Sequence, residues 1–384
     1  MGTHKTPFRG QNEEVFYLEN LDGLRFFSFL LVFLYHSFYT EYDYIQKSSL
    51  YLFVKKFLVA NGNVGVNIFF VISGFLITLL LIKEKSSKGT INLKNFWIRR
   101  ILRIWPLYYF CVLFGFVVFP LLKIFMGQIP NETAHIGYYL VFLNNFDFIN
   151  NGLPDASILG VLWSVAIEEQ FYLVWPILLC YLPKNKYWLV FIVTIFCSLL
   201  FRFIYIDDFI RLEHHTFSCM GDLAVGAMGA WLVSEKQKFK YFIENLRRWQ
   251  IVVIYALLLF YLLYRKEIMM SGDIVRLFER LFLAVISLFI ILEQCYSRNS
   301  LFKIGKLKLI SRLGIITYGL YCLHFIGILI TINFTSLLGL NTELWQVIFF
   351  EMPVSLLISI ILAKISFKIY ETPFLRIKKR FSVL

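Results

Sequence analysis

Predominantly apolar segments, most of them long enough to cross a bilayer, recur along the whole 384-residue chain. A helix crosses a hydrocarbon core of roughly 30 Å with about 17 to 25 residues. Segments of about this length lie at 21–40, 64–83, 104–126, 160–182, 187–206, 215–234, 250–265, 276–294, 312–333 and 345–368. Hydrophobic residues make up 59% of the chain and charged residues only 16%, a balance that no water-soluble core of this size needs. The sequence therefore predicts an all-α, multi-pass membrane bundle of about ten transmembrane helices.

The placement of lysine and arginine predicts the orientation of this bundle, because short cytoplasmic loops are enriched in both residues. These cations gather in alternate connections and in the C-terminal tail, within 83–103, 184–186, 236–248, 298–312 and 368–380. The long connection from Gly127 to Gly160 contains neither residue. Both termini are therefore expected to be cytoplasmic. Most of the net charge of +13 follows from this topology, and nucleic-acid binding is not expected because the cations are dispersed over several loops.

The chain is predicted to form a single integral membrane domain over residues 1–384, with a short cytoplasmic stretch at 1–20 and a tail at 370–384. No Gly/Ser-rich or Pro-rich linker separates a soluble module, and no cleavable signal is apparent. The six cysteines lie in or beside apolar segments without CxxC spacing, so neither a disulfide framework nor a metal site is expected. The stretch 135–146 is too short to span the bilayer and fits either a re-entrant or an interfacial segment.

Arg25 and His36 are the first candidates for chemistry, because both interrupt an otherwise apolar segment. Their eleven-residue separation places them on one face of a helix, about three turns and roughly 16 Å apart. Ionisable groups in a membrane segment usually face the bundle interior and mark a functional pathway. An imidazole suits proton abstraction from a hydroxyl near neutral pH, so His36 is the candidate base and Arg25 its partner. The alternatives are an arginine that reaches the lipid headgroups and an interfacial histidine.

Two adjacent carboxylates, Glu168 and Glu169, lie about 12 Å inside the outer end of their segment, at a depth similar to that of His36. A buried carboxylate needs a partner or a proton, and His36 is a natural partner. Adjacent helical residues diverge by about 100°, so one glutamate is expected to face the site, and Glu168 is favoured. A structural hydrogen-bond network is the alternative. Midway along another apolar segment, Ser73 and Gly74 either leave room for a narrow ligand or serve helix packing.

Three arginines, Arg99, Arg100 and Arg103, open the third segment at the expected cytoplasmic surface. Guanidinium groups suit phosphates, so this arginine cluster is a candidate site for the phosphorylated head of a cytosolic cofactor. Positive-inside anchoring is the alternative. Arg99 and Arg103, four residues apart, share a helix face. His324 is either a further site group or a packing histidine, and the remaining charges in or at the ends of apolar segments are expected to form structural pairs: Arg202, Asp222 and Glu371.

Taken together in their order, these motifs resemble the acyltransferase-3 family of integral membrane O-acyltransferases over nearly the whole chain. The resemblance rests on LDGLR before the Arg25 and His36 pair, GVNIFFVISGF, RIWPLYY after the arginine cluster, LWSVAIEEQFYLVWP, YGLYCLH and a terminal ETP. It implies a ten-helix bundle in which His36 is catalytic, Arg25 supports it or the donor, and the arginine cluster grips the phosphates of coenzyme A. Asn67 departs from the acidic residue often found in GVDIFF, and no fused SGNH domain is expected after the tenth helix.

The resulting hypothesis is an enzyme that moves an acyl group, expected to be acetyl, from cytoplasmic acyl-CoA to a hydroxyl of a cell-surface or lipid-linked glycan. Acyl-CoA is the expected co-substrate, no metal is expected, and the expected location is a bacterial plasma membrane. Direct transfer and an acyl-histidine intermediate both fit. The rival is a secondary transporter or flippase, although no inverted repeat is visible. Catalytic roles are expected for His36, Glu168 and Arg25, and cofactor binding for Arg99, Arg100, Arg103 and Ser73.

Overall fold

The computed structural model describes residues 18–59 and 61–381, and these residues form helices and connecting turns with no β-strand among them. A helix lies at each predicted apolar segment, which confirms the all-α expectation. The principal helices are α1 (Glu19–Ser37), α4 (Gly62–Lys88), α5 (Leu93–Leu113), α10 (Leu162–Tyr181), α11 (Tyr187–Ile204), α13 (Thr216–Glu235), α15 (Arg248–Met270), α16 (Asp273–Tyr296), α18 (Thr317–Leu338) and α20 (Met352–Ile365).

Shorter helices connect or extend the principal ones. Four π-helical turns continue a neighbouring α-helix: η1 (Lys55–Val59), η2 (Phe114–Val118), η5 (Val347–Glu351) and η6 (Ser366–Glu371). Three are 3₁₀ turns: η3 (Lys184–Lys186), η4 (Ile304–Lys306) and η7 (Lys379–Phe381). The short α-helices are α2 (Asp43–Gln46), α3 (Ser49–Val54), α6 (Phe119–Phe125), α7 (Ile136–Leu140), α8 (Asn144–Asn151), α9 (Ser157–Gly160), α12 (Phe209–His214), α14 (Gln237–Glu244), α17 (Lys308–Ile315), α19 (Leu344–Gln346) and α21 (Thr372–Lys378).

Seven helical stretches within the described residues are long and apolar enough to cross a membrane, which supports a multi-pass membrane protein. The predicted total of ten spans and the cytoplasmic location of both termini stay predictions, because α1, α15 and α16 are not among the seven. Helix α1 carries Asp22, Arg25 and His36 within its length. The seven stretches are Ser49–Lys88, Leu93–Phe125, Ser157–Tyr181, Lys184–Ile204, Phe209–Glu235, Thr317–Leu338 and Leu344–Phe381.

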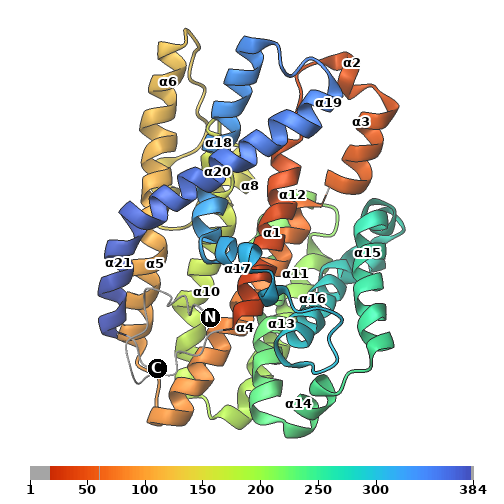
Figure 1. Ribbon diagram of the computed structural model, residues 1–384. Coiled ribbons are helices and arrows are strands. Elements are labelled where there is room, and N and C mark those ends of the chain that lie inside the picture. The colour runs from red at the N-terminus through yellow and green to blue at the C-terminus, as the bar shows by residue number, and fades with distance from the viewer. Residues whose placement is uncertain (1–17, 60, 382–384) are drawn as a thin grey trace, which may run out of the picture.

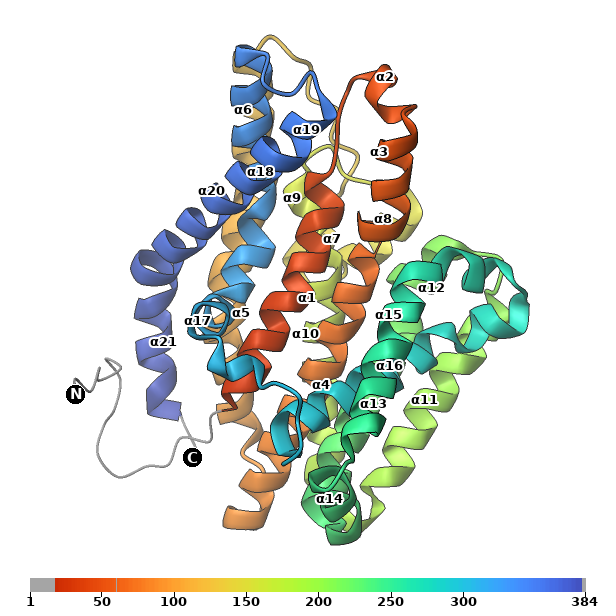
Figure 2. The same ribbon diagram turned by 45° about the vertical axis from the view of Figure 1, so that its right-hand side comes forward.

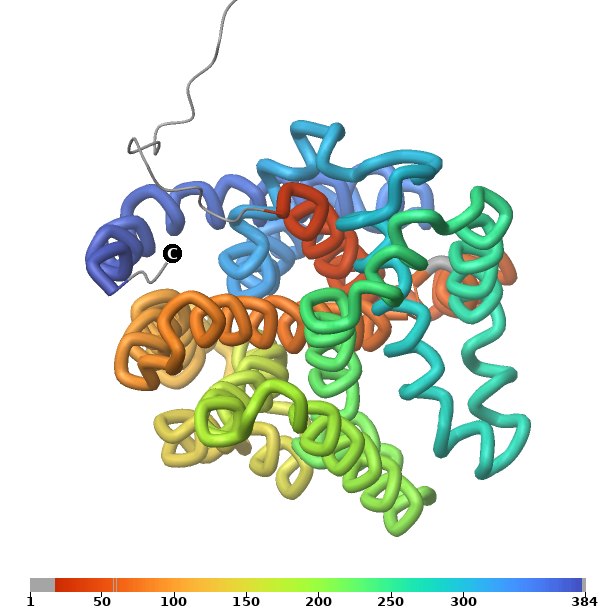
Figure 3. The backbone as a smooth tube through the Cα atoms, turned by 90° about the horizontal axis from the view of Figure 1, so that it is seen from below, coloured from red at the N-terminus to blue at the C-terminus, as the bar shows by residue number. Residues whose placement is uncertain are grey.

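Helices α1 and α4 run through the middle of the molecule (Figure 2). Helices α5, α6, α18, α20 and α21 lie on one side of them, and α11 to α16 lie on the other. The view from below gives the same division, with the blue C-terminal helices and the green-to-cyan helices at opposite edges (Figure 3). We call the end that holds α14 the lower end and the end that holds α2, α3 and α19 the upper end (Figure 1).

Two glycines allow α4 and α13 to approach closely. A Cβ atom on Gly74 would lie 1.9 Å from the carbonyl oxygen of Leu223, and one on Gly226 would lie 2.0 Å from that of Val71. Small residues at such a crossing permit backbone contact between helices, which strengthens van der Waals packing where lipid weakens the hydrophobic contribution. Gly74 therefore serves helix packing, the second alternative that the sequence left open for it.

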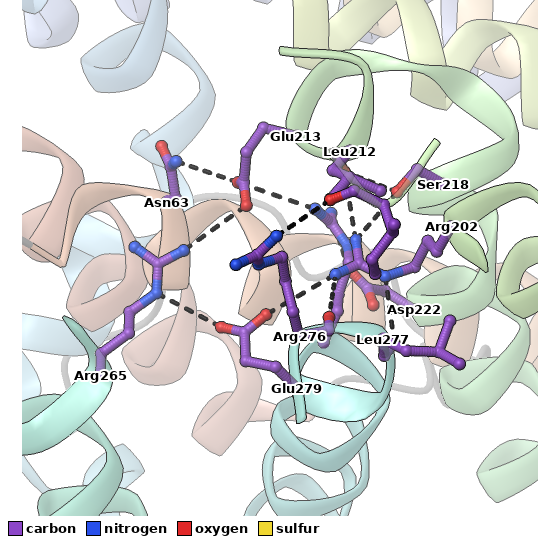
Figure 4. Close-up of polar contacts among 12 residues, drawn as sticks. Asn63, Arg202, Leu212, Glu213, Ser218, Asp222, Arg265, Arg276, Leu277 and Glu279 are labelled. Carbon is purple, nitrogen blue, oxygen red and sulfur yellow. Dashed lines mark hydrogen bonds and ion pairs between the residues drawn. The ribbon is translucent and has the colours of Figure 1, made fainter. Parts of the chain in front are cut away.

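Buried charges join α11, α12, α13, α15 and α16 (Figure 4). Arg280 forms an ion pair of 2.8 Å with Asp222, and Arg265 lies between Glu279, at 3.4 Å, and Glu213, at 3.6 Å. Each arginine is matched by a carboxylate, as buried ions require. The sequence predicted structural pairing for Asp222 but missed its partner, because Arg280 becomes a neighbour only when α13 packs on α16.

Arg202 belongs to the same charged cluster. Its guanidinium lies 3.9 Å from the Glu279 carboxylate and donates hydrogen bonds to the backbone carbonyls of Leu212, Leu277 and Arg276. The predicted structural pairing is therefore present for Arg202. Glu371 accepts a hydrogen bond from Ser366 and lies within electrostatic range of Arg103, without a direct ion pair to any described residue.

The connection at 127–159 contains the two short helices α7 and α8, of which α7 packs against α5 and α8 against α10. Side chains of α5 and α10 donate hydrogen bonds to its backbone: Tyr108 donates to the carbonyl of Tyr139, and Gln170 donates to the carbonyl of Phe142. The re-entrant and the interfacial alternatives for 135–146 both stay predictions, since Tyr139 is buried while Ile136, Leu140 and Val141 are exposed. Burial alone would raise the pKa of Asp155 in this connection, but hydrogen bonds from Lys123 and from the Asn131 backbone lower the pKa instead.

Candidate functional site

A cavity between α1, α4, α5, α10 and α18 collects most of the predicted site residues, and we call it the lower cavity. It holds about 770 Å³ of space not filled by atoms, including its open mouth. Polar and charged groups line it beside aromatic rings, so it can accept a ligand that has both a charged and an apolar part. The predicted residues on its wall are Arg25, Ser73, Arg100, Arg103 and Glu168, joined by Tyr172, Tyr318 and Tyr321.

Glu168, not Glu169, faces the lower cavity. Its carboxylate accepts hydrogen bonds from the Ser73 hydroxyl, at 2.6 Å, and from the Tyr172 hydroxyl, at 3.1 Å. Glu169 lies on a different face of α10, where the indole of Trp105 donates to it at 2.8 Å. The helical divergence of adjacent residues produces this separation. Ser73 thus lines the lower cavity and also orients the glutamate beside it.

The three clustered arginines have different partners. Arg99 donates to the carbonyl of Phe381 at 2.8 Å and pairs with the buried Glu84 at 3.3 Å, so it faces away from the lower cavity. Arg100 and Arg103 line that cavity and make no hydrogen bond or ion pair with residues 18–59 and 61–381. The sequence assigned all three arginines to phosphate binding, which stays a prediction. Of the three, Arg100 and Arg103 line the lower cavity, whereas Arg99 turns to Glu84 on α4.

Aromatic rings and further charges surround these two guanidinium groups. Arg100 lies 5.7 Å from the ring of Phe96 and 5.8 Å from that of Tyr172, and its Nε atom is buried without a partner. Lys378 of α21 lies within electrostatic range of Arg100 and Arg103. Carboxylates also lie within electrostatic range, Glu169 near Arg100 and Glu371 near Arg103, but none pairs directly with either guanidinium in the described part of the chain. Both arginines therefore keep hydrogen-bond donors that an anion could use.

His36 lies in a second cavity, which we call the upper cavity. This cavity is lined mostly by apolar side chains of α1, α18 and the η2–α6 segment, among them Phe114, Phe119 and Phe325. Arg25 faces the lower cavity instead, where it pairs with Asp22 at 3.1 Å. The shared helix face predicted for Arg25 and His36 therefore does not bring them into one cavity. The two residues face different cavities, both of which α1 borders.

The predicted contact between His36 and Glu168 is also absent. The partner of His36 is His324 of α18, whose Nε2 atom lies 2.9 Å from His36 Nδ1. His324 is fully buried, and its own Nδ1 atom lies 2.7 Å from the carbonyl oxygen of Tyr321. Because the Tyr321 side chain lines the lower cavity, His324 lies between the two cavities. The sequence left its role open, and the signal that could have identified it is a second histidine deep in an apolar segment.

No group of three or more histidine, cysteine, aspartate or glutamate side chains in the described part of the chain is arranged to hold a metal ion. The lower cavity offers hydroxyl, carboxylate and guanidinium groups, and its guanidinium groups can bind an anion. The upper cavity offers the imidazole of His36, which can exchange a proton. This division suits a reaction between a charged donor and an alcohol.

Comparisons with known proteins point to the same chemistry. The Peptidoglycan O-acetyltransferase OatA of Listeria monocytogenes is 27% identical, an alignment covering 93% of this chain and 56% of that protein. The protein named "Putative O-acetyltransferase SACOL0978" of Staphylococcus aureus is 28% identical, covering 97% of this chain and 59% of the relative. The chain thus spans a little over half the length of these relatives, and no solved structure matches it. A family model described as an acyltransferase domain matches residues 18–364, and the chain therefore belongs to the acyltransferase-3 family.

Proposed function

We propose that this membrane protein is an O-acyltransferase that moves an acetyl group from acetyl-CoA to a hydroxyl of a cell-surface or lipid-linked glycan. The observation that carries the proposal is the pair of cavities on α1. Arg100 and Arg103, which form no ion pair with described residues, line one cavity and His36 lines the other, while the buried His324 is hydrogen-bonded to one lining residue of each. The names of the relatives support the acetyl group and the glycan acceptor.

Donor binding is assigned to Arg100 and Arg103, with Arg25 and Lys378 nearby. The phosphates of coenzyme A need charge-assisted hydrogen bonds, and a guanidinium group matches phosphate geometry bidentately. Neither guanidinium group makes a hydrogen bond or ion pair with the described residues, so their donors are free for such a ligand. Coenzyme A is too charged to enter lipid, so its head stays at the lower end while its acyl end reaches toward the middle of the bundle.

Acyl transfer is assigned to His36. Its imidazole takes the proton of the acceptor hydroxyl as the oxygen attacks the thioester carbonyl carbon. The carbon–sulfur bond then breaks, an ester forms, and the leaving thiolate of coenzyme A takes the proton from the imidazolium. Glu168 and Ser73, hydrogen-bonded on the wall of the lower cavity, are assigned to orient the donor arm.

The test compares the full chain with two single variants in a bacterial host and in proteoliposomes. His36→Ala is expected to lower transfer by about 10²- to 10⁴-fold, the contribution of a general base. The readouts are thiol release from acetyl-CoA and alkali-labile acetate on purified surface glycans, peptidoglycan first. Full transfer by His36→Ala would refute its role, and glycan export without use of acetyl-CoA would favour the transporter.

The matched control is His135→Ala. His135 is an exposed histidine of the connection at 127–159, so the same change there removes an imidazole without touching either cavity. We expect wild-type transfer from this variant.

A further inference from the structure

We propose that His324 is a positioning residue that sets the tautomer of His36 and leaves the Nε2 atom of His36 unprotonated in the upper cavity. The inference rests on the proposed function for its catalytic meaning and on the hydrogen bonds of the two rings for its geometry.

The backbone fixes the position of the proton on His324. A carbonyl oxygen can only accept hydrogen bonds, and the Nδ1 atom of His324 lies 2.7 Å from the carbonyl oxygen of Tyr321. The Nδ1 atom must therefore carry a proton. In a neutral imidazole the other ring nitrogen is then an acceptor, so His324 Nε2 presents a lone pair.

The tautomer of His324 in turn determines the tautomer of His36. Its Nδ1 atom lies 2.9 Å from His324 Nε2, and a hydrogen bond between two ring nitrogens needs one donor and one acceptor. Since His324 Nε2 accepts, His36 Nδ1 donates. The remaining nitrogen of a neutral His36, Nε2, has no proton and makes no hydrogen bond with any described residue. Two hydrogen bonds therefore determine which nitrogen of His36 acts as the base.

The surroundings of His324 keep it neutral. Its side chain is fully buried, and the rings of Phe29, Phe33 and Phe325 surround it at centroid distances of 5.9, 6.5 and 4.7 Å. No carboxylate contacts either imidazole within residues 18–59 and 61–381. A buried cation without a counter-ion is strongly unfavourable, so a doubly protonated His324 does not compete.

The arrangement also supports the charge that develops during transfer. When His36 Nε2 takes the hydroxyl proton, the ring becomes a cation whose Nδ1 proton already bonds to His324. A second proton on the fully buried His324, which has no carboxylate partner among the described residues, is unfavourable, so the charge stays on His36 and the Nε2 proton passes to the leaving thiolate. His324 thus acts without touching the substrate.

Two substitutions of similar size test the inference in the full-length chain, with acetyl-CoA as donor and a chito-oligosaccharide as acceptor. In His324→Gln the side-chain amide can accept from His36 and donate to Tyr321, as the imidazole does. In His324→Leu neither bond can form. We expect His324→Gln to keep kcat within about tenfold of wild type and His324→Leu to lose about 10²- to 10⁴-fold, with the KM for acetyl-CoA unchanged in both.

A second readout does not depend on turnover. Nitrogen-15 NMR of histidine-labelled protein in nanodiscs distinguishes protonated from unprotonated ring nitrogens, with His36→Gln used to assign the signals. We expect an unprotonated Nε2 on His36 in the wild type and in His324→Gln, and a mixture of tautomers in His324→Leu. A protonated Nε2 in the wild type, or equal kcat in His324→Leu and wild type, would overturn the inference. If the wild type transfers no acetyl group, the proposed function fails, and the NMR result alone decides the tautomer.

Discussion

At the scale of single residues, the partner of a charge decides its role. Arg99, Arg100 and Arg103 lie within two turns of α5, yet only Arg99 is satisfied, by Glu84 and the backbone of Phe381. A guanidinium offers five donors, and leaving them unpaired among apolar groups is unfavourable unless a ligand supplies acceptors. The two unpaired arginines are therefore the ones that a polyanionic donor would satisfy.

We expect Arg100→Gln combined with Arg103→Gln to raise the KM for acetyl-CoA by at least about tenfold. Each charged hydrogen bond contributes about 1.5 to 3 kcal/mol, and 1.4 kcal/mol corresponds to a tenfold change in affinity. Initial rates in proteoliposomes at varied acetyl-CoA measure this change. The kcat at saturating donor should fall much less, because neither arginine contacts His36.

Lys238→Gln is the matched control for the arginine variant. Lys238 is an exposed cation on α14, at the same end of the molecule and outside both cavities. Equal KM values for the control and the double variant would mean that the arginine cluster does not bind the donor and only anchors the membrane topology.

At the scale of helices, α4 positions the lower cavity because it packs on both α1 and α13. Its contact with α13 is backbone to backbone at Gly74, and the adjacent Ser73 carries the hydroxyl that binds Glu168. One turn of α4 therefore combines a packing residue and a cavity residue. A shift of α4 away from α13 would move Ser73 and weaken the wall of the lower cavity.

We expect Gly74→Val to destabilise the protein by about 1 to 3 kcal/mol, the usual penalty for overpacking. The added Cβ would lie 1.9 Å from the Leu223 carbonyl oxygen, which is backbone and cannot rotate away. Thermal unfolding in detergent, followed by fluorescence or size-exclusion recovery, measures the loss. An unchanged midpoint would mean that α4 and α13 are further apart than described.

Gly137→Ala provides the comparison for this helix contact. A Cβ atom on Gly137, in the short helix α7, would meet no other atom within 4 Å. Alanine is favoured over glycine inside a helix by roughly 0.5 to 1 kcal/mol, so this variant should unfold at or above the wild-type midpoint.

At the scale of the whole molecule, the cations and the candidate catalytic histidine are separated along the direction from the lower to the upper end. The cation-rich helix α14 lies at the lower end, while α2, α3 and α19 lie at the upper end (Figure 1). Arg100 and Arg103 line the lower cavity and His36 lines the upper one. With the lower end in the cytoplasm, acyl-CoA would approach from inside and the acceptor from outside.

Two cysteine variants test this orientation. Gln237 begins α14, Gln128 lies in the connection after α6, and both are exposed. In intact cells, a maleimide that cannot cross membranes should label Gln128→Cys and leave Gln237→Cys unlabelled until the cells are lysed. The wild type, with its six native cysteines, supplies the background. The reverse labelling pattern would invert the topology and remove the route for cytoplasmic acyl-CoA.

The helices, their approximate ends and the membrane class could be predicted from the sequence alone, because an apolar segment of bilayer length is a local property of the chain. The family could be predicted as well, since its motifs are short and ordered. The favoured choice of Glu168 over Glu169 as the residue facing a cavity needed only the angle between adjacent helical residues.

The side-chain partners depended on the tertiary structure. The pairing of His36 with His324, the turn of Arg99 toward Glu84 and the ion pair of Asp222 with Arg280 all join different helices. Spacing within one helix says which residues share a face but not which other helix covers that face. The packing of α1 against α18 and of α13 against α16, and the short turn from α4 to α5, determine these partners. Such packing is the sum of many weak contacts that no single segment contains.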